Sequence, residues 1–354
     1  MHECSRMERI MRTIKMGNTG LTATAPALGC LPLQRRNVED AVKLIRKAYD
    51  GGIRFYDTAN AYTDSEYKLG IALEGVRKNC IVATKSTSTD KKGAWEHIRN
   101  SLKMLRTDYI DLFQFHCVQK MPDINDPDGA FAAALEAKEQ GIIRHIGVTT
   151  HLIAVAEQCI ESGDFETLQF PFSYISAQKD IDLAAKCEAK GMGFIAMKGL
   201  AGGLITNVRA CHAFMKQYPS VVPIWGIQTE EELQQWLDMA EEDPDMTDEL
   251  LSQIAEDKRE LGSGFCRGCG YCMPCPVDIP INNAARMNML LRRSPYQGYM
   301  TDEWHEKMNR INNCLECGSF ASKCPYQLNT PELLKYMLKD YNEFYELHKN
   351  ETVD

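Results

Sequence analysis

The sequence predicts a (β/α)8 barrel of the TIM type followed by a smaller, mostly α-helical domain. Over about 200 to 250 residues, short apolar strands alternate with amphipathic helices, a pattern typical of an α/β barrel. After residue 261 the alternation stops, and seven cysteines fall in two clusters. We therefore expect a barrel with an N-terminal hairpin and an acidic linker helix within residues 1–261, and a cysteine-rich domain within residues 262–354.

The expected elements follow one another in a regular order. Two β-prone runs flank the turn residues 17–20 in MRTIKMGNTGLTATAPALG, which is typical of a hairpin. Val38, Val42, Ile45 and Tyr49 then recur at helical spacing. Counting the second run of the hairpin, eight strand candidates alternate with helices, the other seven being RFYDTA, IVATK, YIDLFQFH, IIRHIGVTT, LQFPF, GFIAMKG and VPIWGIQ.

An open doubly wound sheet is the alternative to the barrel. That fold usually places a G-x-G-x-x-G loop after its first strand, and APALGCLPLQ has no such loop. A barrel carries its chemistry at the C-terminal ends of its strands. The polar residues at those ends are Asp57, Lys85, His116, Thr149, Gln169 and Lys198.

Composition limits the classes of function and partner. The net charge is −9, and residues 230–260 carry thirteen acidic side chains, as expected for a solvated helical face and linker. No apolar run approaches the ~20 residues that span a bilayer, and no basic stripe with interleaved aromatic residues suggests nucleic acid. The N-terminal segment lacks the apolar core of a signal peptide, and the fourteen cysteines suit a reducing compartment, so we expect a cytoplasmic protein.

Four polar residues at or after strand ends suit the delivery of a proton to a carbonyl group. The phenol of Tyr62 has an ordinary pKa of about 10, which the nearby ammonium of Lys85 would lower by stabilising the phenolate. The carboxylate of Asp57 would hold that lysine charged, and His116 would orient a carbonyl oxygen. Each residue alone has a structural explanation, but the four together predict a site for carbonyl reduction.

Longer motifs in the same region are YDTANAYTDSEYKLGIAL, IVATKS, LRTDYIDLFQFH, GIIRHIGVTTH and FIAMKGLAGG. Through them, roughly residues 12–240 resemble the aldo-keto reductase family. The resemblance implies a barrel that binds a nicotinamide cofactor at the strand C-termini, and it implies the roles given above to the four residues. The cofactor-binding residues that it implies are Gly29, Thr149, Thr150, Gln169, Met197, Lys198, Gly199, Leu200, Gly226, Gln228 and Glu232.

Three positions depart from the pattern of many relatives. The resemblance places Met197 where an aromatic residue often stacks on the nicotinamide. It places Glu232 where NADPH-dependent relatives often carry an arginine, and Trp236 where an asparagine often meets the adenine. Because a carboxylate repels a phosphate, we expect NAD to bind at least as well as NADP.

The C-terminal cysteines form two runs, and a proline follows each. Cys266, Cys269, Cys272 and Cys275 lie at three-residue steps, and a second run contains Cys314, Cys317 and Cys324. The runs resemble those of bacterial ferredoxins, which implies one [4Fe–4S] cluster on Cys266, Cys269, Cys272 and Cys324 and a second on Cys275, Cys314 and Cys317. CxxC pairs also form zinc sites, but the repeated steps and the Cys-Pro endings favour iron–sulfur.

The second cluster is one thiolate short, because Phe320 stands where a third cysteine of the second run is expected. Three outcomes are open. The site loses an iron and becomes [3Fe–4S], or it stays [4Fe–4S] with one iron closed by water or a small molecule, or only one cluster forms. We expect the other cysteines to be buried small side chains, with Cys117 beside His116 as the position to watch.

Barrel and clusters together predict an oxidoreductase that interconverts a small-molecule carbonyl and alcohol with NAD or NADP. Because a barrel of this kind moves a hydride and a cluster moves one electron, the clusters would couple the site to a carrier such as a ferredoxin or flavodoxin, as in anaerobic metabolism. Two alternatives are an electron-transfer protein that turns over no free substrate and a regulatory subunit. In either case the clusters could serve only to stabilise a small domain.

Overall fold

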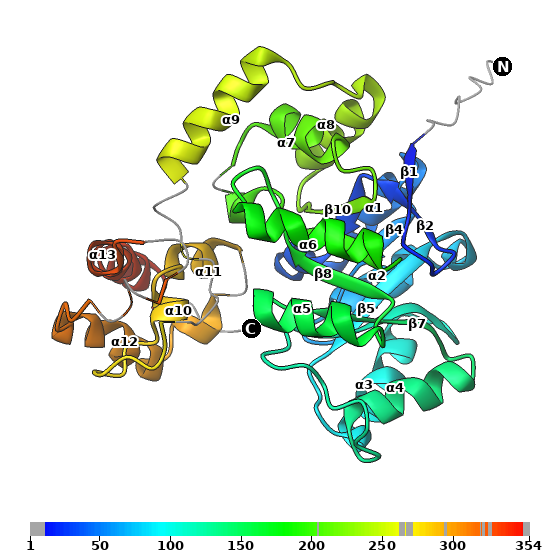
Figure 1. Cartoon of the computed structure of the whole chain (residues 1–354), viewed down its shortest axis with the longest axis horizontal. Coiled ribbons are helices and arrows are strands. Elements are labelled where there is room, and N and C mark those ends of the chain that lie inside the picture. Colours follow the sequence, from blue (N-terminus) through cyan, green and yellow to red (C-terminus); the bar gives the residue numbers. More distant parts are fainter. Residues whose placement is uncertain are drawn as a thin grey trace. The chain divides into compact units, whose positions relative to one another are not determined.

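The computed structural model contains two compact units (Figure 1). Contacts between backbone positions divide the chain into Met1–Leu250 and Leu251–Asp354. This division falls inside helix α9 (Asp248–Leu261), and the domain boundary expected after residue 261 stays a prediction. The residues that the structure describes are 11–203, 205–261, 266, 272–293, 296–318, 320, 323–324 and 328–349.

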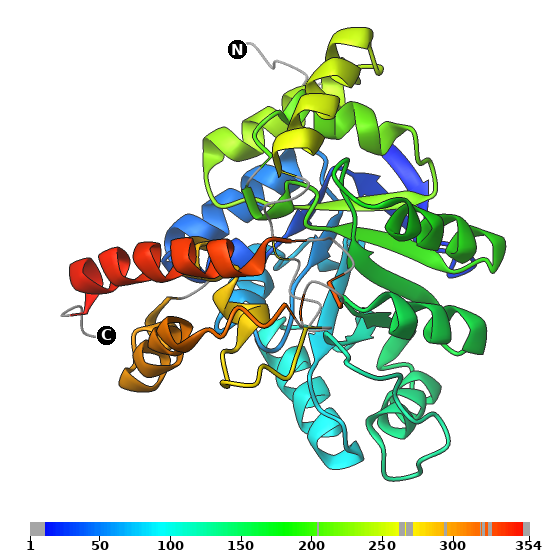
Figure 2. The ribbon, with the colours of Figure 1, turned by 60° about the vertical axis from the view of Figure 1, so that its left-hand side comes forward.

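Eight parallel strands close into a barrel in the first unit, as the sequence predicts. Each strand pairs with the next along the chain, and the last pairs with the first. Figure 2 shows the strands at the centre with helices around them. The strands are β3 (Ala27–Gly29), β4 (Phe55–Asp57), β5 (Ile81–Ser86), β6 (Ile110–Phe115), β7 (Ile143–Thr149), β8 (Thr167–Pro171), β9 (Gly193–Met197) and β10 (Val221–Gly226). The helices are α1 (Val38–Asp50), α2 (Ser65–Ala72), α3 (Lys91–Met104), α4 (Ala130–Glu139), α5 (Ile153–Ser162), α6 (Gln178–Ala189), α7 (Val208–Lys216) and α8 (Glu230–Glu242).

A hairpin packs against the end of the barrel at which the strands begin. Strands β1 (Arg12–Lys15) and β2 (Thr22–Ala25) pair antiparallel around the expected turn. Pro26 then separates β2 from β3, because proline has no N–H to donate to a ladder. Ile14 and Met16 are buried in one hydrophobic cluster with Phe55, the first residue of β4. The opposite, C-terminal ends of the strands are therefore the ends that carry the candidate site.

Helix α1 buries a different stripe from the expected one. The sequence predicts an apolar face through Val38 and Ile45, but Val38 lies exposed in the first turn. The buried residues are Ala41, Leu44, Ile45 and Ala48, which have the i, i+3, i+4, i+7 spacing of one helix face.

The described part of the second unit is mostly helical, as predicted. A hydrophobic core of its own contains Ile279, Met287, Met308, Leu334 and Tyr341. Within the ranges that the structure describes, no helix in either unit has the length and apolar character to cross a bilayer. After α9, the helices are α10 (Ile281–Ala284), α11 (Met287–Arg293), α12 (Asp302–Asn309) and α13 (Thr330–His348), with short 3-10 turns between them.

Candidate active site

A buried ion pair lies at the C-terminal ends of two neighbouring strands. Asp57 ends β4, and Lys85 is the last but one residue of β5. The Lys85 Nζ lies 2.7 Å from Asp57 Oδ2 and donates a second hydrogen bond of 2.6 Å to the carbonyl oxygen of Thr58. Only 3% of Asp57 and 1% of Lys85 are exposed. The lysine head is therefore held at one point by two acceptors.

Tyr62 and His116 extend this pair into a contiguous group of four residues. Tyr62 lies in the loop before α2, and its ring centroid is 5.1 Å from Lys85 Nζ. His116 directly follows β6, and its ring meets that of Tyr62 edge to face with centroids 5.5 Å apart. Both side chains are partly exposed. The structure thus brings the four predicted catalytic residues together at the mouth of the barrel.

The charges of the buried pair depend on each other. Burial is the largest single effect and lowers the pKa of Lys85, but Asp57 and Tyr62 together outweigh it and keep the lysine pKa above its ordinary value. Burial raises the pKa of Asp57, while the Lys85 ammonium and the amides of Gln169 and Gln114 act in the opposite direction. The pair thus presents a fixed ammonium to Tyr62.

Burial has the larger effect on the tyrosine. It raises the pKa of Tyr62 above the ordinary value, and the Lys85 charge and hydrogen bond lower it only in part. Lys85 therefore lowers the pKa of Tyr62 as the sequence predicts, but the net pKa of Tyr62 is raised because burial has the larger effect. The phenol consequently keeps its proton at neutral pH, as a proton donor must.

His116 is a neutral side chain. Burial and the nearby Lys85 ammonium lower the pKa of His116 to about 3. Its Nδ1 is buried and has no hydrogen-bond partner in the described part of the chain. A neutral, partly exposed imidazole can offer a hydrogen bond to a ligand without adding a second positive charge beside Lys85.

Gln114 is a site residue that the sequence argument missed. It lies within β6, fully buried, and its Nε2 approaches Asp57 Oδ1 at 3.4 Å and Gln169 Oε1 at 2.9 Å. Gln169 Nε2 in turn lies 3.4 Å from Asp57 Oδ2. The two amides thus support the carboxylate from the far side. A glutamine inside each of the apolar runs LFQFH and LQFPF was the available signal.

The predicted cofactor residues at the ends of β7 and β8 are neighbours. Thr149 and Gln169 are register partners on these strands. Thr149 Oγ1 accepts a 2.7 Å hydrogen bond from the backbone N–H of Cys117, and Thr150 Oγ1 donates one of 2.8 Å to the carbonyl oxygen of Val118. The two hydroxyls therefore also hold the loop that follows His116.

The remaining predicted cofactor residues lie at the ends of β9 and β10. Met197 ends β9, and Lys198 follows in the left-handed region with φ of 59°. Gly199 packs so closely on Trp225 that an added Cβ would lie 2.3 Å from its ring, and Leu200 comes next. Gly29 and Gly226 are register partners that end β3 and β10.

The start of α8 places a carboxylate on the backbone of the preceding loop. Glu232 Oε2 accepts a 2.7 Å hydrogen bond from the backbone N–H of Gln228, while Thr229 caps the helix by accepting from the N–H of Glu232. Trp236 is buried, and its ring stacks on Trp225 with centroids 3.7 Å apart. Both side chains singled out by the sequence thus have structural partners.

Cys117, the residue after His116, contacts His151, a pairing that the sequence did not predict. Cys117, in the left-handed region with φ of 54°, is partly exposed, and its Sγ lies 3.3 Å from Nδ1 of His151. Cys4 lies outside the described residues. The other barrel cysteines are buried, as expected, and they are Cys30, Cys80, Cys159, Cys187 and Cys211.

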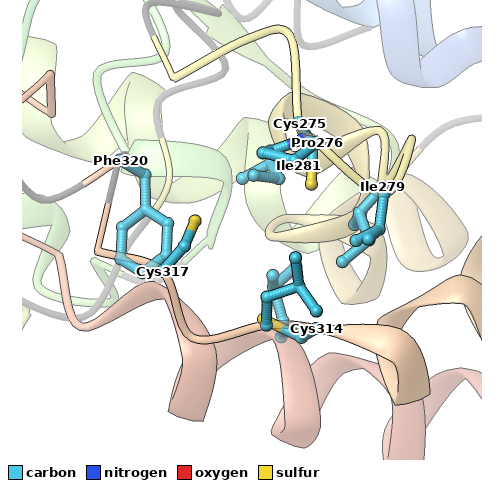
Figure 3. A pocket seen from close by; sticks show the side chains of 10 residues that line it. Cys275, Pro276, Ile279, Ile281, Cys314, Cys317 and Phe320 are labelled. Atoms are coloured by element: carbon cyan, nitrogen blue, oxygen red, sulfur yellow. The ribbon is translucent and has the colours of Figure 1, made fainter.

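Three of the predicted cluster ligands line one cavity in the second unit. Figure 3 shows Cys275, Cys314 and Cys317 around it, together with Phe320. Of the other predicted ligands, Cys266, Cys272 and Cys324 are described and Cys269 lies outside the described residues. Within the described ranges, no three His, Cys, Asp or Glu side chains converge closely enough to hold a single metal ion.

The aldo/keto reductase family model matches residues 27–217, more than half of the chain. The chain belongs to the aldo-keto reductase family. A second model, the 4Fe-4S dicluster domain, matches residues 265–329 and covers all seven predicted ligand cysteines. The chain therefore carries a 4Fe–4S dicluster domain after an aldo-keto reductase barrel, and the predictions of family, fold and enzyme class are confirmed at this level.

Curated relatives of this aldo-keto reductase share the barrel region. The chain is 27% identical over 211 residues to the uncharacterized oxidoreductase YqkF of Bacillus subtilis, and the aligned region covers 56% of this chain and 67% of that protein. It is 30% identical over 212 residues to L-galactose dehydrogenase of Arabidopsis thaliana, which covers 54% of this chain and 66% of that protein. The chain thus spans about two thirds of the length of each.

Solved structures agree on the fold. The aldo-keto reductase AKR11C1 from Bacillus halodurans, in its holo form, aligns with a TM-score of 0.60 at 21% identity, over 70% of this chain and 96% of that one. An aldo-keto reductase from Klebsiella pneumoniae in complex with NADPH aligns with a TM-score of 0.60 at 20% identity, over 70% and 95%. At these identities the likeness supports the barrel architecture alone.

The donor groups of this aldo-keto reductase fit both groups that the family resemblance implies. The adjacent hydroxyl of Thr149 and amide of Gln169 suit the carboxamide of a nicotinamide, and Met197 offers an apolar face on the strand after Gln169. Thiols spread around a cavity, rather than converging on one point, suit a multi-iron cluster better than a single zinc ion.

Proposed function

We propose that the barrel interconverts a carbonyl and an alcohol with a nicotinamide cofactor. The observation that carries the proposal is the buried Lys85–Asp57 pair beside Tyr62, with a neutral His116 in edge contact with the tyrosine ring. This arrangement offers a phenolic proton, a fixed positive charge and a neutral hydrogen-bonding group in one place. Such a set fits an oxygen that gains negative charge during the reaction.

Each of the four residues has a distinct task in this proposal. The reduced nicotinamide, when bound by Thr149, Gln169 and Met197, supplies the hydride that the carbonyl carbon accepts. Tyr62 holds its proton because its pKa is raised, and it releases the proton to the carbonyl oxygen as charge develops there. Lys85 stabilises the phenolate left behind, and Asp57 keeps Lys85 charged. His116, uncharged, orients the carbonyl oxygen.

The first turn of α8 favours NAD over NADP in the same proposal. Glu232 and its neighbours Glu230 and Glu231 bring three carboxylates to this turn. Two cations, Lys47 and Arg36, interact electrostatically with Glu231 in this turn. Each already has an acidic partner: Lys47 lies 2.7 Å from Glu230 and Arg36 lies 3.6 Å from Asp40. A 2′-phosphate would therefore meet repulsion from the carboxylates of this turn, while Lys47 and Arg36 are each already paired with an acidic side chain.

The dicluster domain supports a coupling between the barrel and a one-electron carrier such as a ferredoxin or flavodoxin. A hydride carries two electrons, whereas a cluster accepts them one at a time, so the clusters would split the pair. The coupling is tested by mixing the cluster-loaded protein with NADH under strict anaerobiosis and following the visible absorbance of the clusters. Bleaching of that absorbance supports the coupling, while unchanged clusters favour a structural role.

The carbonyl activity is tested by replacing Tyr62. With a panel of carbonyl compounds and NADH, Tyr62→Phe is expected to lower turnover ~100-fold or more, because the general acid is lost. The matched control is Tyr67→Phe, since Tyr67 lies on α2 with 39% of its surface exposed. Nicotinamide binding, measured by fluorescence titration, should be the same in both variants.

The proposal fails if Tyr62→Phe keeps the turnover of the parent protein, because the proton donor would then lie elsewhere. If no compound in the panel is turned over although the nicotinamide binds, the barrel acts as an electron-transfer module instead. If neither turnover nor nicotinamide binding is found, the regulatory alternative is favoured.

A further inference from the structure

Cys275, Cys314 and Cys317 come from two separate segments of the chain and line one cavity. Cys275 lies before α10, and the other two follow the 3-10 turn Arg310–Asn313. Cys275 is buried, Cys314 is partly buried and Cys317 is exposed. Figure 3 shows the three side chains and Phe320 reaching the cavity from these two separate segments. The segments that hold the predicted second cluster are thus already brought together.

No fourth ligand stands among the described residues that line this cavity. Apart from the three thiols, their side chains carry only carbon and hydrogen, so none can donate electrons to iron. The lining residues are Cys275, Pro276, Val277, Ile279, Ile281, Cys314, Leu315, Cys317, Phe320 and Leu334. The local chemistry therefore provides three thiolates and an apolar wall.

Phe320 forms the wall at the place where a thiolate is expected. It follows Cys317 by the same three-residue step that separates Cys314 from Cys317. Its side chain is only 7% exposed, and its carbonyl oxygen accepts hydrogen bonds from the backbone N–H of Lys323 at 3.0 Å and of Cys324 at 2.7 Å. These bonds hold the backbone of Phe320, and the low exposure of its side chain shows that the ring packs into the cavity wall.

From this geometry we infer that the site holds its cluster through three thiolates only and that its stable form has three irons. A fourth iron at the side of Phe320 would need water or hydroxide as its ligand. Burying such a polar ligand against the ring and the aliphatic wall costs free energy unless it is hydrogen-bonded, and apart from the three ligand thiols none of these lining side chains offers a partner. The inference concerns the dicluster domain and does not depend on the carbonyl chemistry of the barrel.

The conversion can be written with atoms and electrons balanced. A one-electron oxidant such as ferricyanide takes one electron from the [4Fe–4S]2+ form, which releases one Fe2+ and leaves [3Fe–4S]+. The three bonds from Cys275, Cys314 and Cys317 stay intact, because the departing iron has no protein thiolate to break. The first site, with four thiolates, has no comparable exit.

The test uses the full chain, purified without air, with iron and sulfide counting and EPR spectroscopy before and after one equivalent of ferricyanide. The parent protein should hold about seven irons per chain after oxidation and show the EPR signal of an oxidised three-iron cluster. Adding Fe2+ and a reductant should remove that signal, and ferricyanide should restore it.

Two variants separate the missing ligand from the bulk of the ring. Phe320→Cys supplies a fourth thiolate, so it should hold about eight irons and lose the three-iron signal. Phe320→Leu removes the ring but adds no ligand, so it should keep the signal of the parent protein. If Phe320→Cys does not fold, the reversible signal of the parent protein and of Phe320→Leu still decides the question.

Other results would overturn the inference. Two four-iron clusters that persist in the parent protein after ferricyanide would show that another group supplies the eighth ligand. About four irons per chain, with no three-iron signal, would show that the second run only completes the first cluster. A three-iron signal that persists in Phe320→Cys would place the open corner away from Phe320.

Discussion

Lys85 carries a charge in a place where burial alone would remove it. The carboxylate of Asp57, 2.7 Å away, supplies the compensation, and two glutamine side chains support that carboxylate from the other side. A buried pair of this kind contributes little stability by itself, since desolvation offsets most of the attraction. Its value lies in fixing one positive charge beside the Tyr62 phenol, so its presence at the barrel mouth is better explained by chemistry than by folding.

The pH dependence of carbonyl reduction should follow the tyrosine alone. The pKa of Tyr62 is raised from its ordinary value of about 10, so the phenol stays protonated through neutral pH and loses its proton only above that value. The pKa of His116 is about 3, so the imidazole is uncharged throughout the same range. We expect a flat rate from about pH 6 to about pH 9 and a fall only above about pH 10.

This profile is measured as kcat/KM against pH, with the residual rate of Tyr62→Phe as the control. The variant should show no fall at high pH, because the titrating group is gone. A step at about pH 6.5 in the parent protein, absent in a His116→Asn variant, would mean that the imidazole titrates and would contradict the neutral assignment.

The sequence predicted which four residues lie together at the barrel mouth, but it did not predict their protonation states. Asp57, Tyr62, Lys85 and His116 are proposed because each lies at or after the end of an apolar strand. The net direction of the Tyr62 pKa depends on how deeply the ring is buried, which no local pattern reveals. The support from Gln114 depends on register across three strands, and that too requires the closed barrel.

At the N-terminus of α8, side chains of the protein occupy backbone N–H groups that could otherwise bind a phosphate. Helix N-termini attract anions through their free N–H groups and their dipole. Here the terminus is already satisfied, because Thr229 caps it and Glu232 reaches back to the N–H of Gln228. Because Glu232 accepts from the backbone N–H of Gln228, one residue before the N-cap Thr229, it is a structural residue as well as a charge near the expected cofactor.

We expect NADH to bind at least as tightly as NADPH, and Glu232→Gln to shift the ratio toward NADPH by about 2- to 5-fold at low salt. The amide oxygen of the variant can still accept the hydrogen bond from Gln228, so the charge is removed without the cap. Fluorescence titration with both reduced cofactors measures the ratio. The matched control is Glu242→Gln, at the opposite end of the same helix and paired with Arg209.

A preference of the parent protein for NADPH by tenfold or more would contradict this assignment. A cation from another loop would then have to reach the phosphate, or Lys47 or Arg36 would have to leave its present carboxylate.

Helix α1 shows that periodicity predicts a helix more reliably than it predicts the buried face of that helix. Periodicity predicted a helix there, but its buried face runs through Ala41, Leu44, Ile45 and Ala48 and leaves Val38 exposed.

The whole molecule joins a large strand-built core to a small helical one. The order of strands and the two cysteine runs were readable because each follows a local spacing rule. The division between the units falls near the start of the continuous helix α9, and the boundary expected after residue 261 stays a prediction. A helix has the same local pattern on both sides of such a point, so only contacts over long sequence distances define it.

A structural role and a redox role of the clusters lead to different thermal unfolding of the full chain. The second unit has its own core, with Ile279, Met287, Met308, Leu334 and Tyr341. Its described cysteines lie outside the helices α10 to α13. Removing iron with a chelator would release the loops that the thiolates tie together, while the hydrogen-bonded barrel would lose nothing. We therefore expect scanning calorimetry of the full chain to show two transitions, with the one assigned to the second unit moved to lower temperature by chelation and restored by iron and sulfide. A single transition that chelation moves as a whole would show that the two units unfold as one cooperative body. If chelation moves neither of the two transitions, the clusters add nothing to folding, and electron transfer is left as the reason for their presence.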